Sequence, residues 1–121
     1  MTPFLRTIPA IALALAIAVS AHATSSLSFE GGGYWIDLEV GETARPVIAS
    51  VRFHAPDDRD GVVLARDLVT VESFDTARRV LVLRHAAGND GVEPFTLSVE
   101  ADAAVLDIDG RRVTAAFDWS M

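Results

Sequence analysis

The sequence predicts an all-β fold, namely a small immunoglobulin-like β-sandwich of about seven or eight antiparallel strands. Apolar and polar residues alternate with a period of two over most of the chain after residue 23. No stretch beyond that residue shows sustained helical spacing, and Gly, Pro, Asn and Asp mark turns about every eight to twelve residues. A small closed β-barrel is the alternative architecture for the same pattern.

Residues 1–23 have the pattern of a secretory signal peptide. Arg6 supplies a positively charged start, residues 8–19 form an apolar run, and Ala21-His22-Ala23 fits the small-x-small cleavage rule. The apolar run is too short to cross a bilayer. We therefore expect a signal peptide over 1–23 and a single β domain over 24–121, exported to a periplasm or secreted. The use of arginine without lysine suggests a bacterial source.

Composition narrows the classes of partner. One of the ten cations, Arg6, lies in the predicted signal, so nine cations face 17 acidic residues and the mature chain has a formal net charge of −8. This balance argues against nucleic acid or anionic lipid as a partner, and it permits steering toward a basic partner. No second long apolar stretch follows the apolar run, so we expect no membrane insertion. The chain has no cysteine, so its stability must come from packing and strand pairing.

Strands are expected wherever the alternation runs between turn signals. A run that is apolar on both faces, 80–83, is typical of a central strand covered on both sides. The other expected strands are 27–30, 34–40, 47–54, 62–64, 68–74, 95–101, 104–109 and a last strand that runs through Trp119.

Two hairpin registers follow from the pattern. Asp109-Gly110 suits a two-residue type I′ turn, which pairs Ile108 with Arg111, Leu106 with Val113 and Ala104 with Ala115. In the second hairpin we expect Val40 to pair with Val47 across residues 41–46. The inward pairs are then all apolar, namely Leu38 with Ala49, Ile36 with Val51 and Tyr34 with Phe53.

The second register also defines a candidate binding surface on the opposite face of the strands. It places Trp35 opposite Arg52, with Asp37 diagonal to Arg52. Trp and Arg are favoured at the centres of interfaces, so Trp35, Asp37 and Arg52 are predicted to contact a partner. The alternatives are that a second layer or the N-terminal residues cover Trp35, or that Trp35 and Arg52 form a simple surface cation–π pair.

Little in the sequence points to catalysis. The mature chain has two histidines, His54 and His85, each at the end of a predicted strand, and we interpret them as surface or loop residues. No serine lies in a nucleophile-elbow setting, and there is no cysteine nucleophile. The prediction is a protein that is not an enzyme, with no catalytic residues and no cofactor.

The acidic loop 57–61 invites comparison with a calcium site. When Gly61 takes the glycine position of an EF-hand, Pro56 falls at the first ligand position and Asp67 replaces the final glutamate. We therefore predict no metal site and interpret the loop as a solvated acidic turn, with a calcium loop of another kind as a less favoured alternative.

These expectations combine into a binding function. The sequence predicts a protein-binding or envelope-accessory module, such as an inhibitor, an immunity-type protein or an accessory subunit, whose partner is another protein or a cell-envelope component. The alternative is a structural or surface-assembly subunit.

Overall fold

The computed structural model describes residues 25–42 and 44–119, and the predicted signal peptide over 1–23 lies outside them. The described residues form nine β-strands and one short 3-10 helix, so the all-β prediction is confirmed. No helix among them is long and apolar enough to cross a membrane. In chain order the elements are β1 Ser25–Gly31, β2 Tyr34–Glu42, β3 Pro46–His54, β4 Val62–Val63, η2 Arg66–Leu68, β5 Val69–Asp75, β6 Val80–His85, β7 Phe95–Glu100, β8 Ala103–Ile108 and β9 Arg111–Asp118.

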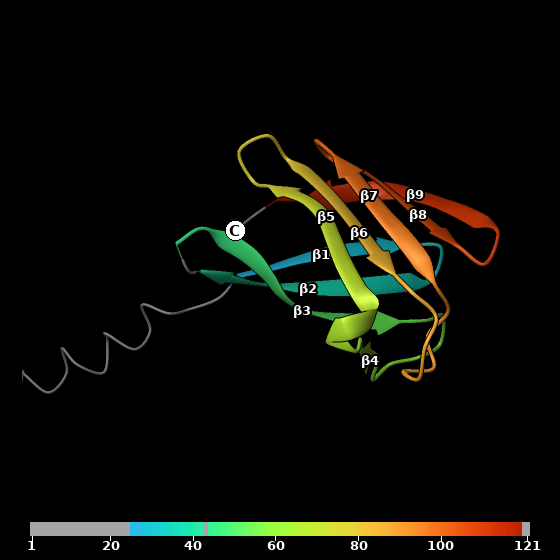
Figure 1. The fold of residues 1–121 in the computed structure, drawn as a ribbon. Helices are drawn as coiled ribbons and strands as arrows, with labels where there is room; N and C mark the ends of the chain where they lie inside the picture. The colour runs from blue at the N-terminus through green and yellow to red at the C-terminus, as the bar shows by residue number, and fades with distance from the viewer. Residues whose placement is uncertain (1–24, 43, 120–121) are drawn as a thin grey trace, which may run out of the picture.

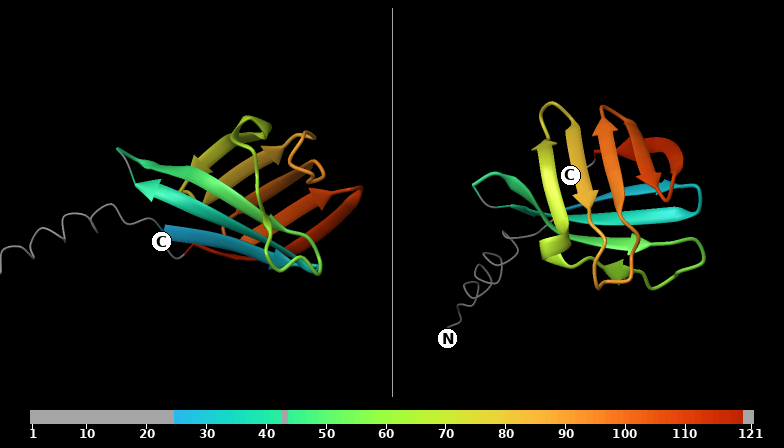
Figure 2. Two further views of the ribbon diagram at one scale, coloured as in Figure 1. Left: turned by 90° about the horizontal axis from the view of Figure 1, so that it is seen from below. Right: turned by 45° about the vertical axis from the view of Figure 1, so that its right-hand side comes forward.

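The strands form one antiparallel sheet in the order β4-β3-β2-β1-β9-β8-β7-β6-β5. Each strand lies beside its neighbours in the sequence, as in an up-and-down meander, except that β4 and β5 lie at opposite ends of the order. The first and last strands join the two halves through a short pairing of Ser28 with Asp118 and Phe29 with Phe117. The sheet curls so strongly that its halves face each other across the core (Figures 1 and 2).

The sheet stays open between β4 and β5 for a topological reason. All the observed pairings are antiparallel, so counting along the order makes β4 and β5 run in the same direction. Joining parallel neighbours needs a crossover of about a dozen residues or more. Residues 64–68 are too few for such a crossover. They bridge the gap at one end instead, where Leu64 N–H donates to Val51 O and Leu68 O accepts from Ala86 N–H, each at 2.9 Å.

The architecture therefore differs in detail from the expected sandwich. The strands number nine, and they form one continuous curled sheet instead of two separate sheets joined by Greek-key connections. The closed barrel is not formed either, because β4 and β5 do not pair. Strand β6 is second from an edge, and Val80 and Val82 on its outer face are half-buried, so it is less covered than a central strand.

The core lies between the two halves of the sheet. Alternate residues of most long strands point inward, as the period of two requires, and β5 is an exception with four consecutive exposed residues. Those with no exposed surface come from both halves of the sheet, and include Phe29, Ile36, Leu38, Val40, Leu81, Leu83, Leu97 and Leu106.

The hairpin at Asp109-Gly110 is confirmed. Both residues have positive φ, 52° and 72°, as a type I′ turn requires. All three of the expected pairs are present, namely Ile108 with Arg111, Leu106 with Val113 and Ala104 with Ala115.

The register predicted between β2 and β3 is wrong, by two residues over Trp35 to Leu38 and by one residue at Val40. Ile36 pairs with Phe53 and Leu38 with Val51. A register shift between Glu39 and Val40 displaces the two strands relative to each other, and a β-bulge of this kind leaves no simple trace in an alternating pattern. From Trp35 to Leu38 the error is two residues, so side chains there stay on the face that was expected. Beyond the shift Val40 pairs with Ile48, an error of one residue, so Val47, which was expected to point inward, is exposed and Ile48 packs against the core.

Strand directions gather four connections at one end of the curled sheet. These are the β1–β2 turn, the β3–β4 loop, the β6–β7 loop and the β8–β9 turn, and this end is called the loop end below (Figure 1). Both histidines of the described chain close strands at this end, His54 on β3 and His85 on β6.

Candidate functional site

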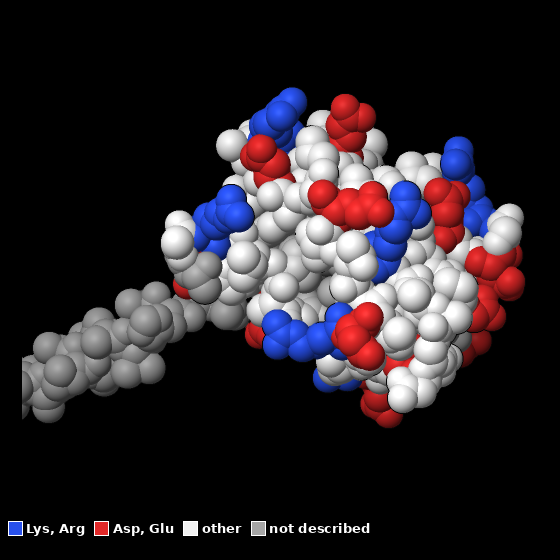
Figure 3. All heavy atoms as spheres, viewed as in Figure 1, with Lys and Arg blue, Asp and Glu red and all other residues white. Residues whose placement is uncertain are grey.

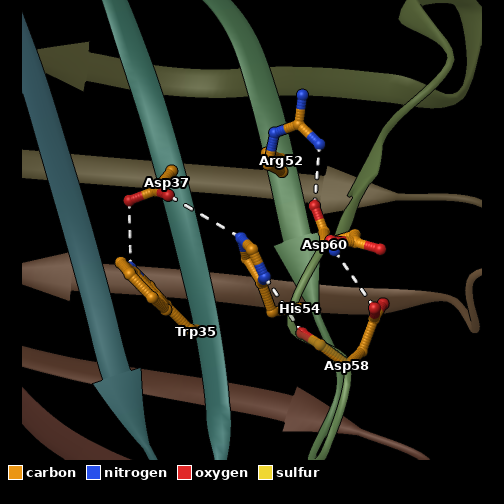
Figure 4. Close-up of polar contacts among 7 residues, drawn as sticks. Trp35, Asp37, Arg52, His54, Asp58 and Asp60 are labelled. Carbon is orange, nitrogen blue, oxygen red and sulfur yellow. Dashed lines mark hydrogen bonds and ion pairs between the residues drawn. The ribbon is translucent and has the colours of Figure 1, made fainter.

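Strands β2 and β3 bring the predicted site residues together on their outer face. Asp37 lies directly opposite Arg52, and Trp35 lies opposite His54 (Figure 4). The predicted grouping of Trp35, Asp37 and Arg52 on one face thus matches their placement, although the individual cross-strand partners differ. The corrected register adds His54 to the group.

Trp35 is an exposed but well-held aromatic ring. Its side chain keeps 45% of its surface exposed, while Ile36 beside it has none. The indole Nε1–H donates to Asp37 Oδ1 at 3.0 Å. The ring stacks on His54, with centroids 4.9 Å apart and planes at 22°. The side chain that stacks on Trp35 is therefore that of His54. The alternative drawn from the sequence was a cation–π pair between Trp35 and Arg52.

His54 is buried, which corrects its interpretation as a surface or loop residue. It is only 7% exposed because Trp35 lies on one side of the ring and the β3–β4 loop on the other (Figure 4). Gly61 in that loop approaches so closely that a Cβ there would lie 2.7–2.8 Å from ring atoms of His54. The ring Nδ1 lies 3.1 Å from Asp58 O.

The other nitrogen of His54 has no hydrogen-bond partner. Nε2 is shielded from solvent, and Asp37 Oδ2 lies 3.8 Å away, beyond hydrogen-bond distance. Asp37 therefore spans the site, with one carboxylate oxygen bonded to Trp35 and the other directed at His54. A small movement of this carboxylate would exchange one contact for the other.

The β3–β4 loop uses its own oxygen atoms to hold its shape. Asp60 O accepts a hydrogen bond from Arg52 Nη1 at 2.9 Å, and Asp58 Oδ1 accepts from Gly61 N–H at 3.1 Å. In the part of the chain that the structure describes, no group of three or more His, Cys, Asp or Glu side chains is arranged to hold a metal ion. Arg52 thus acts on the loop as well as on the outer face.

Trp35, His54 and Asp58 border an open cleft of about 510 Å³, called the outer-face cleft below, whereas Asp37 and Arg52 do not line it. Its lining includes Trp35, His54, the glycines of the β1–β2 turn, and the charged residues Glu30, Asp57, Asp58 and Arg59. None of the residues lining it is Ser, Thr, Cys or Lys. The cleft offers an aromatic face and carboxylates, which is chemistry for binding a cation or a polar chain.

His85 is also buried, and the sequence interpretation as a surface or loop residue is wrong for it too. Its side chain points into the core, and the ring stacks on Phe95 with centroids 5.2 Å apart. Nδ1 lies 3.0 Å from Glu93 O, and Nε2 lies 2.8 Å from Asp90 Oδ2. Both partners are acceptors, so both contacts are satisfied when both ring nitrogens carry protons.

Asp90 is the buried partner of His85 and fixes the β6–β7 loop. Its side chain is 4% exposed, and its oxygens also accept from Val92 N–H at 3.1 Å and Ala65 N–H at 3.4 Å. Burial acts to raise the pKa of Asp90, but the hydrogen bond from His85 and the two backbone donors outweigh it. The pKa therefore lies below the ordinary value of 3.8.

Sequence reasoning missed both histidine environments, for different reasons. His54 is in phase with Arg52, so alternation placed it outward, and no pattern in residues 55–61 showed that the loop would cover it. For His85 a usable signal existed, because His85 is in phase with Leu81 and Leu83, which point inward. The partner, Asp90, follows in a loop whose path the sequence does not specify.

Comparisons with protein-family models, with curated proteins and with solved structures gave no match.

Proposed function

We propose that the chain is an exported, non-catalytic binding module that recognises a basic segment of another protein through the outer-face cleft. The observation that carries the proposal is Trp35. This ring is half-exposed, yet its orientation is fixed by Asp37 and His54. Fixing a large aromatic side chain in advance lowers the entropy lost on binding, which is how recognition residues differ from incidental exposed ones.

Charge selects the class of partner. The cleft places Glu30, Asp57 and Asp58 around the ring, against the single lining cation Arg59. An aromatic face beside carboxylates attracts ammonium and guanidinium groups. The excess of acidic residues over the whole chain would steer a basic partner toward it.

A direct binding measurement tests the proposal. The probe is acetyl-tetralysine amide, with acetyl-tetraglutamate amide as the control of opposite charge. Trp119→Phe removes the second tryptophan, so that the fluorescence of Trp35 alone reports binding. We expect saturable, salt-sensitive binding of the basic peptide only, and Trp35→Ala should weaken it, as measured by calorimetry, by about 1–2 kcal/mol. Equal binding by the Trp35→Ala variant would overturn the proposal.

The export part of the proposal rests on residues 1–23 and has its own test. Mass spectrometry of the protein isolated from its native cell is expected to find a chain that begins at Thr24. A mature chain that still begins at Met1 would contradict export by this route.

A second candidate function, self-assembly, is favoured by the open edges of the sheet. Beyond the two residues of β4, the edge of β3 is unpaired, and it borders a hollow of about 170 Å³ shared with β5. Val47 and Val71, on these two strands, are among the exposed large apolar residues. Exposed edges of this kind pair with other strands. Concentration-dependent oligomers in size-exclusion chromatography, abolished by Val71→Lys, would favour assembly over the binding module.

A further inference from the structure

A second hollow lies at the loop end, inside the rim of the curled sheet. It has a volume of about 230 Å³ and is called the mouth cleft below. Its walls come from three of the four connections gathered at this end, namely the β3–β4 loop, the β6–β7 loop and the β8–β9 turn, together with strand residues beside them. The floor is apolar, made by Tyr34, Phe53, Val92 and Ile108, each of which is at most 8% exposed.

The rim of the mouth cleft is acidic. Asp58, Glu93 and Asp109 supply three carboxylates, and Arg111 supplies the one cation. Arg111 is already engaged, because it donates to the Tyr34 hydroxyl and its guanidinium lies 5.6 Å from the Tyr34 ring centroid. Figure 3 shows acidic side chains gathered at the right-hand end of the molecule, where the β8–β9 turn lies.

The mouth cleft adjoins the outer-face cleft. Tyr34, Ala55 and Asp58 line both hollows, so the start of the β3–β4 loop forms the wall between them. A single extended segment that crosses this wall would place one side chain against Trp35 and a nearby one in the mouth cleft.

The mouth cleft is held in shape by the buried pair at its back. Asp90 accepts from Val92 N–H, and Glu93 O lies 3.0 Å from His85 Nδ1. Two residues of the lining are thereby fixed through hydrogen bonds to buried side chains. A cleft formed in advance need not spend binding free energy on ordering its walls.

From these features we propose that the mouth cleft binds the side chain of a lysine or arginine in the basic partner segment. The aliphatic stem would pack on the apolar floor, and the charged head would reach the carboxylates at the rim. An anionic chain would be repelled at the rim, and a neutral chain would gain only the contact with the floor. This inference rests on the proposed function, because it assigns a second subsite for the same partner.

The first experiment isolates the mouth cleft with a small probe, hexylammonium chloride, against the mature chain. Hexanol and sodium hexanoate are the neutral and anionic controls of the same length. Methyl resonances of Val92 and Ile108 report the mouth cleft by NMR, and the indole N–H of Trp35 reports the outer face. We expect saturable shifts of both methyl groups with hexylammonium, weaker shifts with hexanol and none with hexanoate.

Charge-matched variants complete the test. Glu93→Gln with Asp109→Asn removes two rim charges, while Glu100→Gln with Asp102→Asn removes two exposed charges at the opposite end. The rim variant should bind hexylammonium about threefold to tenfold more weakly, as expected from two partly exposed ion pairs, and the distant variant should bind it as the wild type does. Equal losses in both variants would mean that only the net charge matters, and would overturn the mouth subsite.

The two proposals fail in different ways. Shifts of Trp35 alone would reject the mouth subsite and leave the outer-face proposal in place. Shifts of Val92 and Ile108 that persist in Trp35→Ala support the mouth subsite, even if binding of the tetralysine peptide proves independent of Trp35. No shift at Val92 or Ile108 with any of the three compounds would reject the mouth subsite.

Discussion

His54 and His85 occupy similar places and do different things. Each is the last residue of a strand at the loop end, and each stacks on an aromatic ring, Trp35 or Phe95, with an aspartate close by. His85 points into the core and has hydrogen-bond partners at both ring nitrogens. His54 lies on the outer face, and its Nε2 has none.

This difference indicates that His85 has a structural role, whereas the surface around His54 can change its contacts when a ligand binds. A buried polar group with every contact satisfied stabilises one geometry, because any change leaves a donor or acceptor unpaired. The contacts around His85 thus fix the β6–β7 loop. Around His54, by contrast, Nε2 has no hydrogen-bond partner and the Asp37 carboxylate is bonded to Trp35 with its other oxygen 3.8 Å from His54, so these contacts can rearrange.

The largest expected effect comes from truncating His85, and the same truncation of His54 is its comparison. His85→Ala leaves the Asp90 carboxylate buried without its partner, so we expect the free energy of unfolding to fall by about 3–5 kcal/mol. His54→Ala removes one stacking contact and one hydrogen bond, so we expect about 1–2 kcal/mol. Urea unfolding of both variants measures the two losses. Equal losses would show that the two sites do not differ in the way described.

The close packing of His54 against the β3–β4 loop can be tested with a pair of glycines. Gly61 and Gly91 both have positive φ, 72° and 78°, but a Cβ at Gly61 would lie 2.7 Å from the His54 ring, whereas a Cβ at Gly91 would have nothing within 4 Å. Gly91→Ala should cost only the backbone strain, about 1–2 kcal/mol. Gly61→Ala should cost about 1–3 kcal/mol more, because it overpacks the ring. Thermal unfolding that gave the same cost for both would argue against the close approach.

The pH dependence of stability tests the His85–Asp90 pair in another way. The pKa of Asp90 is lower in the folded chain than its ordinary value of 3.8. Its ionised form therefore adds stability that is fully present above about pH 4–5 and is lost as the pH falls through the lower, folded pKa. The extra stability of the wild type over Asp90→Asn should shrink over this acid range. Asp109→Asn, at an exposed turn, is the control, and its difference from the wild type should change less.

Much of the fold could be predicted because it rests on local patterns. Alternation placed Trp35 outward and Ile36 inward, and Asp109-Gly110 fixed a hairpin register through its two positive φ values. The β2–β3 register failed because a register shift between Glu39 and Val40 changes the pairing and reverses which residues face inward at the start of β3, which the alternating pattern does not reveal. The single curled sheet depends on the pairing of β1 with β9, the two strands farthest apart in the chain, and no local signal encodes it.

The candidate site was predictable in part for the same reason. Trp35, Asp37 and Arg52 share a face because they have the same parity on adjacent strands, and this survives a register error of two residues. The burial of His54 and the pairing of His85 with Asp90 depend on the paths of two loops. Loop paths are set by tertiary contacts such as the hydrogen bond from Arg52 to Asp60, which the sequence pattern does not reveal.

The smallest expected effect on stability is that of removing the ring that covers His54. Trp35 keeps 45% of its surface exposed, so Trp35→Ala loses one hydrogen bond, one stack and only part of the area that a core tryptophan buries, and we expect a cost of about 1–2 kcal/mol. Ile36→Ala on the same strand is the matched control, and it should cost about 2–5 kcal/mol because it leaves a cavity in the core. If urea unfolding shows that Trp35→Ala is as damaging as Ile36→Ala, then Trp35 is a structural residue that stabilises His54, and the outer-face cleft loses its recognition residue. If Trp35→Ala stays folded and no longer binds the tetralysine peptide, then the Trp35 ring that covers His54 is needed for binding. The contrast between the two histidines would then apply to function as well as to stability.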